Sequence, residues 1–231
     1  PASFEDLQLV HSLKYLRKLQ TGCLSKDEIQ ALELPFSAEL ISFFRLNVGG
    51  TVLAAERALD DGLCIHLGGG FHHAFADHGE GFCLLNDTAV AVEKLQREGR
   101  VGRVMIVDCD VHQGNGTAAI FEKREDVFTF SIHQMDIYPS EKMTGTLDVG
   151  LWSGDGDRAY LEAVRRHFPK IYEEFPPDIV FYLAGADPLA GDQLGGLAVT
   201  KAGLLSRDRI IMEGALLRKI PLVILLAGGY S

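Results

Sequence analysis

Five short apolar runs recur along the chain, and segments with helical periodicity separate them. We expect these runs to form strands that are buried between two layers of helices, because each is apolar on both faces. The runs cover residues 64–67, 104–109, 127–132, 179–184 and 222–226. The helices are expected at 37–59, 86–96, 157–174 and 200–219. This alternation predicts an α/β fold in which helices cover both faces of a parallel sheet.

The length and charge of the chain limit its organisation and its partners. Because one α/β domain often reaches about 250 residues, we expect a single domain over 1–231. We expect this domain to be incomplete at both ends, since no strand opens the chain and a turn signal follows the last apolar run. The formal net charge of −10 repels phosphate backbones, so direct nucleic-acid binding is not expected and a cationic partner fits better.

The cysteines and the N-terminal residues bear on the cellular compartment. None of the four cysteines is spaced as CxxC, which argues against a zinc finger and against a redox pair. Cys64 and Cys109 lie in apolar runs, where a free thiol acts as a small core residue. We therefore expect a cytoplasmic location, or a nuclear one in a eukaryote. The first residues lack the regions of a signal peptide, and no apolar run is long enough to cross a bilayer, so no membrane association is expected.

Polar clusters follow the expected strands at their carboxyl ends. They lie at 68–73, 108–112, 131–133, 185–187 and 228–230. In open parallel sheets, ligands bind beyond the carboxyl ends of the strands. Separate segments therefore direct histidine, aspartate and tyrosine side chains to one edge of the sheet, and this convergence predicts a functional site.

Asp110 and His112 are candidate metal ligands. Residues two apart in an extended segment point the same way, so both side chains can face one ion. A third ligand from another strand end would complete a three-ligand site, and three protein ligands with one open position are typical of catalytic zinc. An Asp-x-His pair taken alone is more often an ordinary turn.

His72 and His73 follow three consecutive glycines at a strand end. Glycines allow a backbone to approach a ligand closely and to adopt positive φ. The loop lacks the GxxxxGK[ST] pattern of a phosphate-binding loop, so that alternative is set aside. Two adjacent imidazoles beside a metal site favour a general base with an electrostatic partner.

Together these segments resemble the histone deacetylase and acetylpolyamine amidohydrolase superfamily, most closely its class IV-like and bacterial branch. An early segment, Leu9-Val10-His11 with Tyr15 after it, also fits. The motifs that carry the resemblance occur in the order of that superfamily and lie at 69–74, 81–87, 107–117, 185–192 and 228–230.

The resemblance implies an arginase/deacetylase-like fold and a metal-dependent hydrolase. Asp110, His112 and Asp187 would bind Zn²⁺, with Fe²⁺ as the alternative ion. His73 would be the base that activates the attacking water and then the acid that protonates the leaving amine. Tyr230 would donate a hydrogen bond to the acyl oxygen.

Further roles are implied for residues around this centre. His72 would be paired with Asp108 as electrostatic support. Asn115 stands where most of these enzymes have an aspartate that orients the active histidine. An amide accepts the imidazole N–H but brings no charge, so we expect His73 to be less basic than in an aspartate-paired enzyme.

The same resemblance assigns a substrate channel and a second ion. Gly81, Phe82 and Tyr138 match positions that line the narrow lysine channel, and Leu194 lies near its rim. Core packing is the alternative interpretation for the two aromatic residues. The backbone around Asp108, Ser131 and Ile132 matches a structural K⁺ site.

Two further departures from the family pattern concern small residues. Ala227 replaces the first glycine expected before Gly228, which we interpret as a tolerated change in the loop. Cys109 stands where a leucine is usual, and we expect it to pack in the core.

The expected activity is zinc-dependent removal of acyl groups, acetyl or longer, from the ε-amine of lysine in proteins. The partner would be an acylated lysine peptide or protein, or an acylated polyamine if the chain is a small-amide hydrolase. A third alternative is a protein that binds acyl-lysine without catalysis. An arginase-like two-metal site is disfavoured because Gln113-Gly114-Asn115 does not provide its additional ligands. Nothing in these patterns indicates an oligomeric state.

Overall fold

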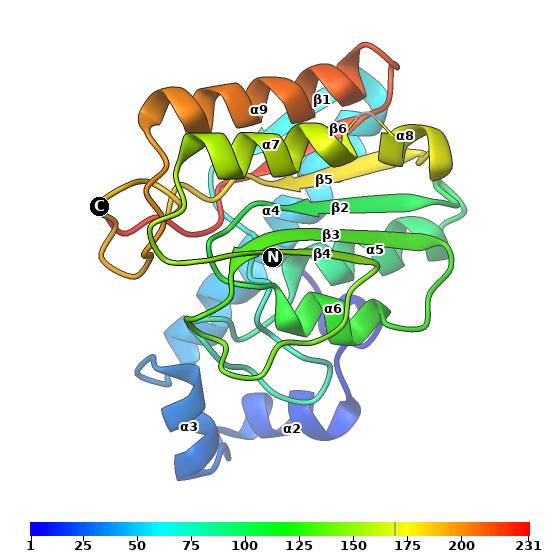
Figure 1. Ribbon diagram of the computed structural model, residues 1–231. Coiled ribbons are helices and arrows are strands. Elements are labelled where there is room, and N and C mark those ends of the chain that lie inside the picture. The colour runs from blue at the N-terminus through cyan, green and yellow to red at the C-terminus, as the bar shows by residue number, and fades with distance from the viewer. Residues whose placement is uncertain (169) are drawn as a thin grey trace.

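Six parallel strands form one sheet in the computed structural model, which describes residues 1–168 and 170–231 (Figure 1). The strand order is β1-β6-β5-β2-β3-β4. The strands are β1 (Leu63–His66), β2 (Val104–Asp108), β3 (Val127–Gln134), β4 (Leu147–Leu151), β5 (Ile179–Leu183) and β6 (Leu222–Leu225). All neighbouring pairs are parallel, so the carboxyl ends of all six strands lie at one edge of the sheet.

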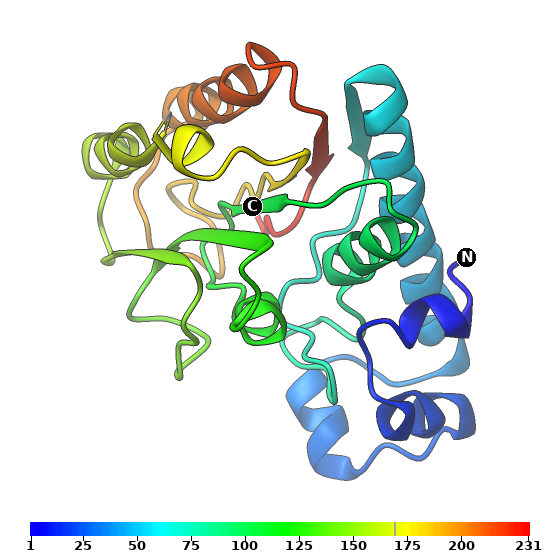
Figure 2. The ribbon, with the colours of Figure 1, turned by 90° about the vertical axis from the view of Figure 1, so that its right-hand side faces the viewer.

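Helices cover both faces of this sheet, which confirms the predicted fold class. Figure 1 shows α7 and α9 on one side of the strands and α5 and α6 on the other, and Figure 2 shows the same layers after a quarter turn. The helices are α1 (Phe4–Leu7), α2 (Leu13–Thr21), α3 (Lys26–Leu32), α4 (Ala38–Asp61), α5 (Asp87–Arg97), α6 (Asn115–Phe121), α7 (Asp157–His167), α8 (Lys170–Glu174) and α9 (Lys201–Leu216).

Alternate residues of the central strands feed two separate cores. Met105 and Val107 of β2 pack with residues of α7, α8 and α9. Val104 and Ile106 of the same strand pack with α4, α5 and α6 on the opposite face. The side chains of a strand alternate between the two faces of a sheet, so a continuous apolar run supplies both cores. This explains why β2 could be predicted from its continuous apolar run.

The N-terminal helices form a third core that the sequence pattern did not predict. Residues of α1, α2 and α3 pack against α4 and the segment before α5, with Leu7, Leu16 and Leu32 fully covered. Serine N-caps begin all three helices, and capping boxes begin α1 and α3. These helices are too short for a strong apolar period. Their serine N-caps were the sequence feature that could have predicted them.

Three other expectations differ from the structure. Strand β4 was missed because Asp148 and Gly150 interrupt its apolar residues at the edge of the sheet. Strand β3 runs to Gln134, so His133 lies within the strand instead of after it. The helix expected at 157–174 is divided: α7 ends at His167 and Phe168 is extended, because the residue before a proline disfavours helical geometry.

The remaining helix expectations are close to the observed bounds. Ser37 is the N-cap of α4, as predicted, and Asn86 and Thr200 cap α5 and α9. Cys109 is buried in the core beside α7 and α9, as expected. No helix in the described ranges has the length and apolarity needed to span a membrane.

Candidate active site

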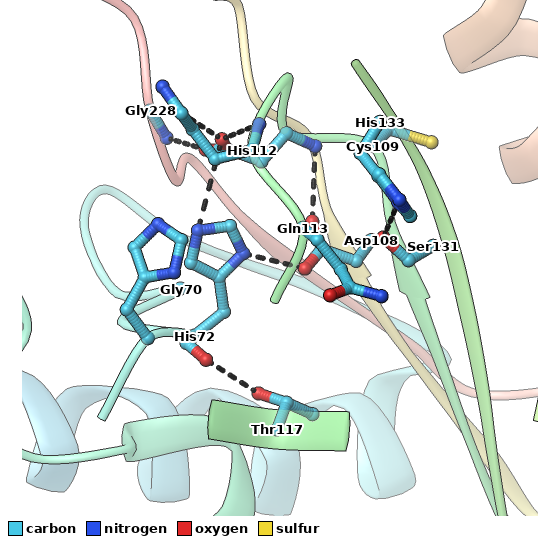
Figure 3. Close-up of polar contacts among 12 residues, drawn as sticks. Gly70, His72, Asp108, Cys109, His112, Gln113, Thr117, Ser131, His133 and Gly228 are labelled. Atoms are coloured by element: carbon cyan, nitrogen blue, oxygen red, sulfur yellow. Dashed lines mark hydrogen bonds and ion pairs between the residues drawn. The ribbon is translucent and has the colours of Figure 1, made fainter. Parts of the chain in front are cut away.

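The loops that follow β1, β2, β5 and β6 meet at the carboxyl edge of the sheet. Figure 3 shows His72 from the first loop directed toward Asp108 at the end of β2, with His112 and Gly228 beside it. The predicted convergence of separate polar clusters is therefore present. Strand order explains it, because β6, β5 and β2 are consecutive neighbours in the sheet.

Asp110, His112 and Asp187 lie together and are all buried. Their potential ligand atoms lie within 4.8 Å of one another. Nδ1 of His112 is 3.1 Å from Oδ1 of Asp110 and 3.5 Å from Oδ2 of Asp187. Asp110 and His112 lie in a bend instead of the expected extended segment. The backbone N–H of His112 donates to Oδ1 of Asp110 at 2.9 Å, which holds the two side chains together.

Three observations show that this cluster fits a divalent cation. Among the described residues, Oδ2 of Asp187 has no hydrogen-bond partner although it is buried. Burial and the nearby Asp110 carboxylate raise the pKa of Asp187, as expected for two like charges held close together. A Cβ added at Gly228 would lie 2.2 Å from Oδ2 of Asp187 and 2.5 Å from Oδ2 of Asp110. The loop after β6 therefore leaves space for an ion beside these carboxylates, and only a glycine at position 228 keeps that space open.

A buried carboxylate holds the glycine-rich loop that carries the two histidines. Asp87, the first residue of α5, accepts hydrogen bonds from the N–H groups of Gly70 (3.0 Å) and Phe71 (2.8 Å). It also accepts from the Thr51 hydroxyl on α4 at 2.5 Å. Gly70 has φ of +83°, a conformation that glycine adopts without strain. The loop is thus fixed between two helices.

The two histidines have different partners. Nδ1 of His72 lies 2.6 Å from Oδ2 of Asp108, and Nδ1 of His73 lies 2.8 Å from Oδ1 of Asn115. Burial lowers the pKa of His72, but the carboxylates of Asp108 and Asp110 outweigh it and raise this pKa to about 9. Burial and the neighbouring His72 hold the pKa of His73 well below its usual range. His73 is therefore a neutral imidazole beside a cationic one. The cause is burial and His72, whereas the hydrogen bond to Asn115 raises the pKa of His73.

A pocket of about 220 Å³ opens beside His73 and His112. The ring of Tyr138 lies across the edge of His73, with ring centroids 4.9 Å apart. The pocket is lined by all four predicted substrate-binding residues and by Tyr230. Glu33 and Ile137 also line it and were not predicted. The full lining is Glu33, His73, Gly81, Phe82, His112, Ile137, Tyr138, Leu194 and Tyr230.

The N-terminal helices position one wall of this pocket. The N–H groups of Gly81 and Phe82 donate to the carbonyl oxygens of Ala31 (3.0 Å) and Leu32 (3.1 Å) at the end of α3. Gly81 and Phe82 both have positive φ, +52° and +65°. Helix α3 thus holds an unusual turn that places Phe82 on the pocket.

A buried aspartate, Asp192, holds Tyr230 in its place on the pocket wall. Oδ2 of Asp192 accepts from the N–H of Tyr230 at 2.7 Å, and Oδ1 accepts from the N–H of Leu194 at 2.9 Å. One carboxylate therefore fixes both residues at the rim. Burial raises the pKa of the Tyr230 hydroxyl above its usual value, so this group stays protonated and can donate a hydrogen bond.

Ala227 precedes Gly228 with φ of +51°. This is the left-handed region, where an L-residue with a Cβ costs about 1 kcal/mol. The structure therefore gives a physical reason for the glycine expected at this position.

The residues assigned to a K⁺ ion lie at adjacent strand ends. Asp108 is directly opposite Ser131 in the register of β2 and β3, and Ile132 follows in β3. The hydroxyl of Ser131 also contacts Nδ1 of His133 at 2.9 Å. Burial lowers the pKa of His133 to about 4.

Sequence reasoning missed several residues that support the site, because each lacks a motif of its own. The position of Glu80 beside Gly81 was its only signal. The residues found only in the structure are Glu33, Glu80, Ile137 and Arg207. Asp87 ends the motif at 81–87, but only the structure shows that it holds the glycine-rich loop.

Comparison with known proteins agrees with this arrangement. An uncharacterized protein of Picosynechococcus is 42% identical over 225 residues, which is 97% of this chain and 75% of that protein. Histone deacetylase 2 of Arabidopsis thaliana is 35% identical and covers 99% of this chain. A histone deacetylase-like amidohydrolase of Pseudomonas aeruginosa is 29% identical, with all of this chain and 65% of that protein covered.

A solved structure gives the same fold. The crystal structure of an HDAC homolog complexed with SAHA superposes with a TM-score of 0.87 at 28% identity and covers all of this chain. The chain spans 62% of the length of the plant relative and 66% of the solved chain. The profile of the histone deacetylase domain matches residues 1–231. This protein belongs to the histone deacetylase domain family.

Proposed function

We propose that the protein is a zinc-dependent hydrolase that removes acyl groups from the ε-amine of lysine in proteins. The observation that carries this proposal is the buried cluster of Asp110, His112 and Asp187, whose His112 lines a pocket together with Tyr138 and Tyr230. Imidazole and carboxylate ligands suit zinc, and Fe²⁺ is the alternative ion. When bound, such an ion polarises an amide carbonyl and lowers the pKa of water.

The protein's own residues supply the proton transfers and orient the substrate. His73 is neutral and has its Nδ1 committed to Asn115, so Nε2 accepts a proton from the attacking water. A C–O bond forms, the C–N bond breaks, and His73 returns the proton to the leaving amine. The Tyr230 hydroxyl donates to the acyl oxygen as negative charge develops there, which is where a donor accelerates the reaction.

The pocket walls suit an acylated amine. Phe82 and Tyr138 provide aromatic surface for the aliphatic stem of a lysine whose charge has been removed by acylation. His72 stays cationic between Asp108 and Asp110 and contributes positive charge near the reacting carbonyl. A K⁺ ion at Asp108, Ser131 and Ile132 and a cytoplasmic location belong to the same proposal.

An acyl-polyamine is the second candidate substrate. Glu33, an acidic residue, lines the pocket, and the chain carries a net charge of −10. Both would attract the remaining ammonium groups of a polyamine. The same catalytic residues serve both substrates, so the difference lies at the mouth of the pocket.

A panel of acyl-lysine peptides and acyl-polyamines, from acetyl to long-chain, tests the proposal. The protein is loaded with zinc and assayed with and without chelator. We expect amine release that the chelator abolishes, and a loss of about 10²-fold in kcat for Tyr230→Phe, as for removal of one oxyanion donor. Binding of acyl-lysine peptides without release of any acyl group would instead identify a non-catalytic binding protein. Faster release from polyamines than from peptides would favour the second candidate substrate.

A further inference from the structure

Glu80 connects the partner of His73 to a wall of the pocket. Its Oε1 accepts a hydrogen bond from Nδ2 of Asn115 at 2.7 Å and another from the Tyr138 hydroxyl at 2.8 Å. The side chain of Glu80 is 22% exposed. It is no metal ligand, and the reaction proposed above gives it no function.

The carboxylate decides which way round the Asn115 amide lies. An amide presents two N–H donors at one end and an acceptor oxygen at the other, whereas an ionised carboxylate only accepts. Nδ2 of Asn115 must therefore face Glu80, and Oδ1 faces Nδ1 of His73 at 2.8 Å. The backbone N–H of Gly116 also donates to Oδ1 at 3.0 Å. All three contacts are satisfied in this orientation. The reversed amide would lose its contacts with Glu80 and with the Gly116 N–H, and it would keep the contact with His73 only with the other imidazole tautomer.

The orientation of Asn115 in turn selects the tautomer of His73. An acceptor at Oδ1 requires the proton on Nδ1, which leaves the lone pair on Nε2. With a reversed amide, Nδ2 would donate to Nδ1 and the proton would move to Nε2, where a base cannot accept another. A histidine fixed in the wrong tautomer is a poor general base.

We propose that Glu80 is a positioning residue, whose carboxylate fixes the Asn115 amide and thereby keeps the His73 proton on Nδ1. As a statement about catalysis this rests on the proposed function, whereas the tautomer is a property of the protein alone. Burial raises the pKa of Glu80, but the contact with His78 and the hydrogen bonds from Asn115 and Tyr138 outweigh it and lower this pKa to about 2. Glu80 is therefore ionised across the neutral range.

The first experiment measures the tautomer directly. The ¹⁵N NMR shifts of the His73 imidazole are recorded for the zinc-loaded wild type, Glu80→Gln and Glu80→Ala. We expect an Nδ1–H tautomer in the wild type and a mixture with Nε2–H in both variants. Glutamine can donate to Asn115 as well as accept from it, and alanine has no group that fixes the amide. Glu141→Gln is the matched control, since Glu141 is an exposed carboxylate on the wall of the cavity next to Glu80. An unchanged tautomer in both Glu80 variants would overturn the proposal.

Kinetics separate this role from an effect on the pocket wall. Glu80→Ala should lower kcat by about tenfold or more, the low range for acid–base contributions, with a smaller change in KM. Tyr138→Phe removes only the second hydrogen bond to Glu80 and should mainly change KM. If Glu80→Ala and Tyr138→Phe gave the same effects on kcat and KM, Glu80 would act only through the pocket wall.

Relocating the charge provides a rescue that a purely structural role would not give. Asn115→Asp alone places two carboxylates in contact and should reduce kcat. Adding Glu80→Gln lets the new amide donate to the aspartate, which then accepts from His73, so the double variant should exceed both single variants in kcat. No rescue would contradict the proposal. A wild type that hydrolyses no amide, yet shows the tautomer shift in Glu80→Ala, would refute the proposed function and retain the positioning role.

Discussion

The guanidinium of Arg207 on α9 donates a hydrogen bond of 2.7 Å to the carbonyl oxygen of Gly185. The same nitrogen lies 3.3 Å from the carbonyl oxygen of Cys109. These carbonyls lie just before Asp187 and Asp110 in the chain, so one side chain that is only 2% exposed connects two ligand-bearing loops. The arrangement indicates that Arg207 of α9 fixes the spacing of the two loops that carry the candidate metal ligands Asp110 and Asp187.

Arg207→Met should therefore weaken both folding and metal retention. Two buried carbonyls lose a charged donor, and each such loss costs about 1–3 kcal/mol, so we expect a destabilisation of about 3 kcal/mol in urea unfolding. Competition with a chelator should show zinc binding that is at least about tenfold weaker, the effect typical of lost support around metal ligands. Arg209→Met, an exposed position on the same helix, is the control. Unchanged zinc affinity would show that the two loops keep their spacing without Arg207.

Asp187→Ala should abolish metal binding while the fold is retained. Asp187 provides one of the three candidate ligands, and its Oδ2 has no partner in the described part of the chain. Removing the carboxylate removes its repulsion with Asp110 and also the acceptor of the Val111 N–H at 2.8 Å. These effects oppose each other, so the metal-free protein should remain folded with little change in stability. Elemental analysis gives the metal content, and circular dichroism checks the fold. Asp61→Ala, at the exposed end of α4, should bind metal normally. Full metal content in Asp187→Ala would show that the ligand set is wrong.

Gly81→Ala should impair the pocket more than backbone strain alone explains. Gly81 has φ of +52°, and an added Cβ would lie 2.7 Å from the Tyr138 hydroxyl and 3.0 Å from Cδ2 of His73. We expect a decrease in kcat/KM of about tenfold or more, from displacement of reacting and binding groups. Gly99→Ala imposes similar strain at φ of +67° with nothing within 4 Å of the added Cβ. Both variants should lose comparable stability, and only Gly81→Ala should lose activity. Equal activities of the two variants would contradict the predicted contact.

Stability should fall on acidification because of His11. This residue is 2% exposed; its Nδ1 donates to the carbonyl oxygen of Phe75 at 3.0 Å, and its Nε2 accepts from the N–H of Asn86 at 3.1 Å. Only neutral imidazole satisfies both contacts, and burial lowers the pKa of His11 to about 4.

The unfolded chain binds a proton on His11 at higher pH than the folded one does. The stabilisation is therefore fully present above about pH 6.5 and is lost as the pH falls toward 4. At pH 5 this linkage removes about 2 kcal/mol of the free energy of unfolding. His11→Asn keeps a donor for Phe75 but cannot titrate. It should be less stable at pH 7 and should change less between pH 7 and pH 5. A pH dependence equal to that of the wild type would exclude His11 as the source.

The sequence and the structure agree best where local chemistry decides the outcome. Ser37, Asn86 and Thr200 begin helices because their side chains satisfy free backbone N–H groups in the first turn. Strand β2 was predictable because both its faces are buried. Strand β4 was not, because an edge strand tolerates Asp148 and Gly150 among its apolar residues.

By itself the sequence determined the parallel α/β class, the side chains that gather at the carboxyl edge of the sheet, and the family through its ordered motifs. Those features follow from periodicity and from short spacings within each segment. Tertiary structure alone decided the contacts of Glu80 with Asn115 and of Arg207 with Gly185. These pairs are distant in the chain, and only the packing of helices against the sheet brings a donor within hydrogen-bonding distance of its acceptor.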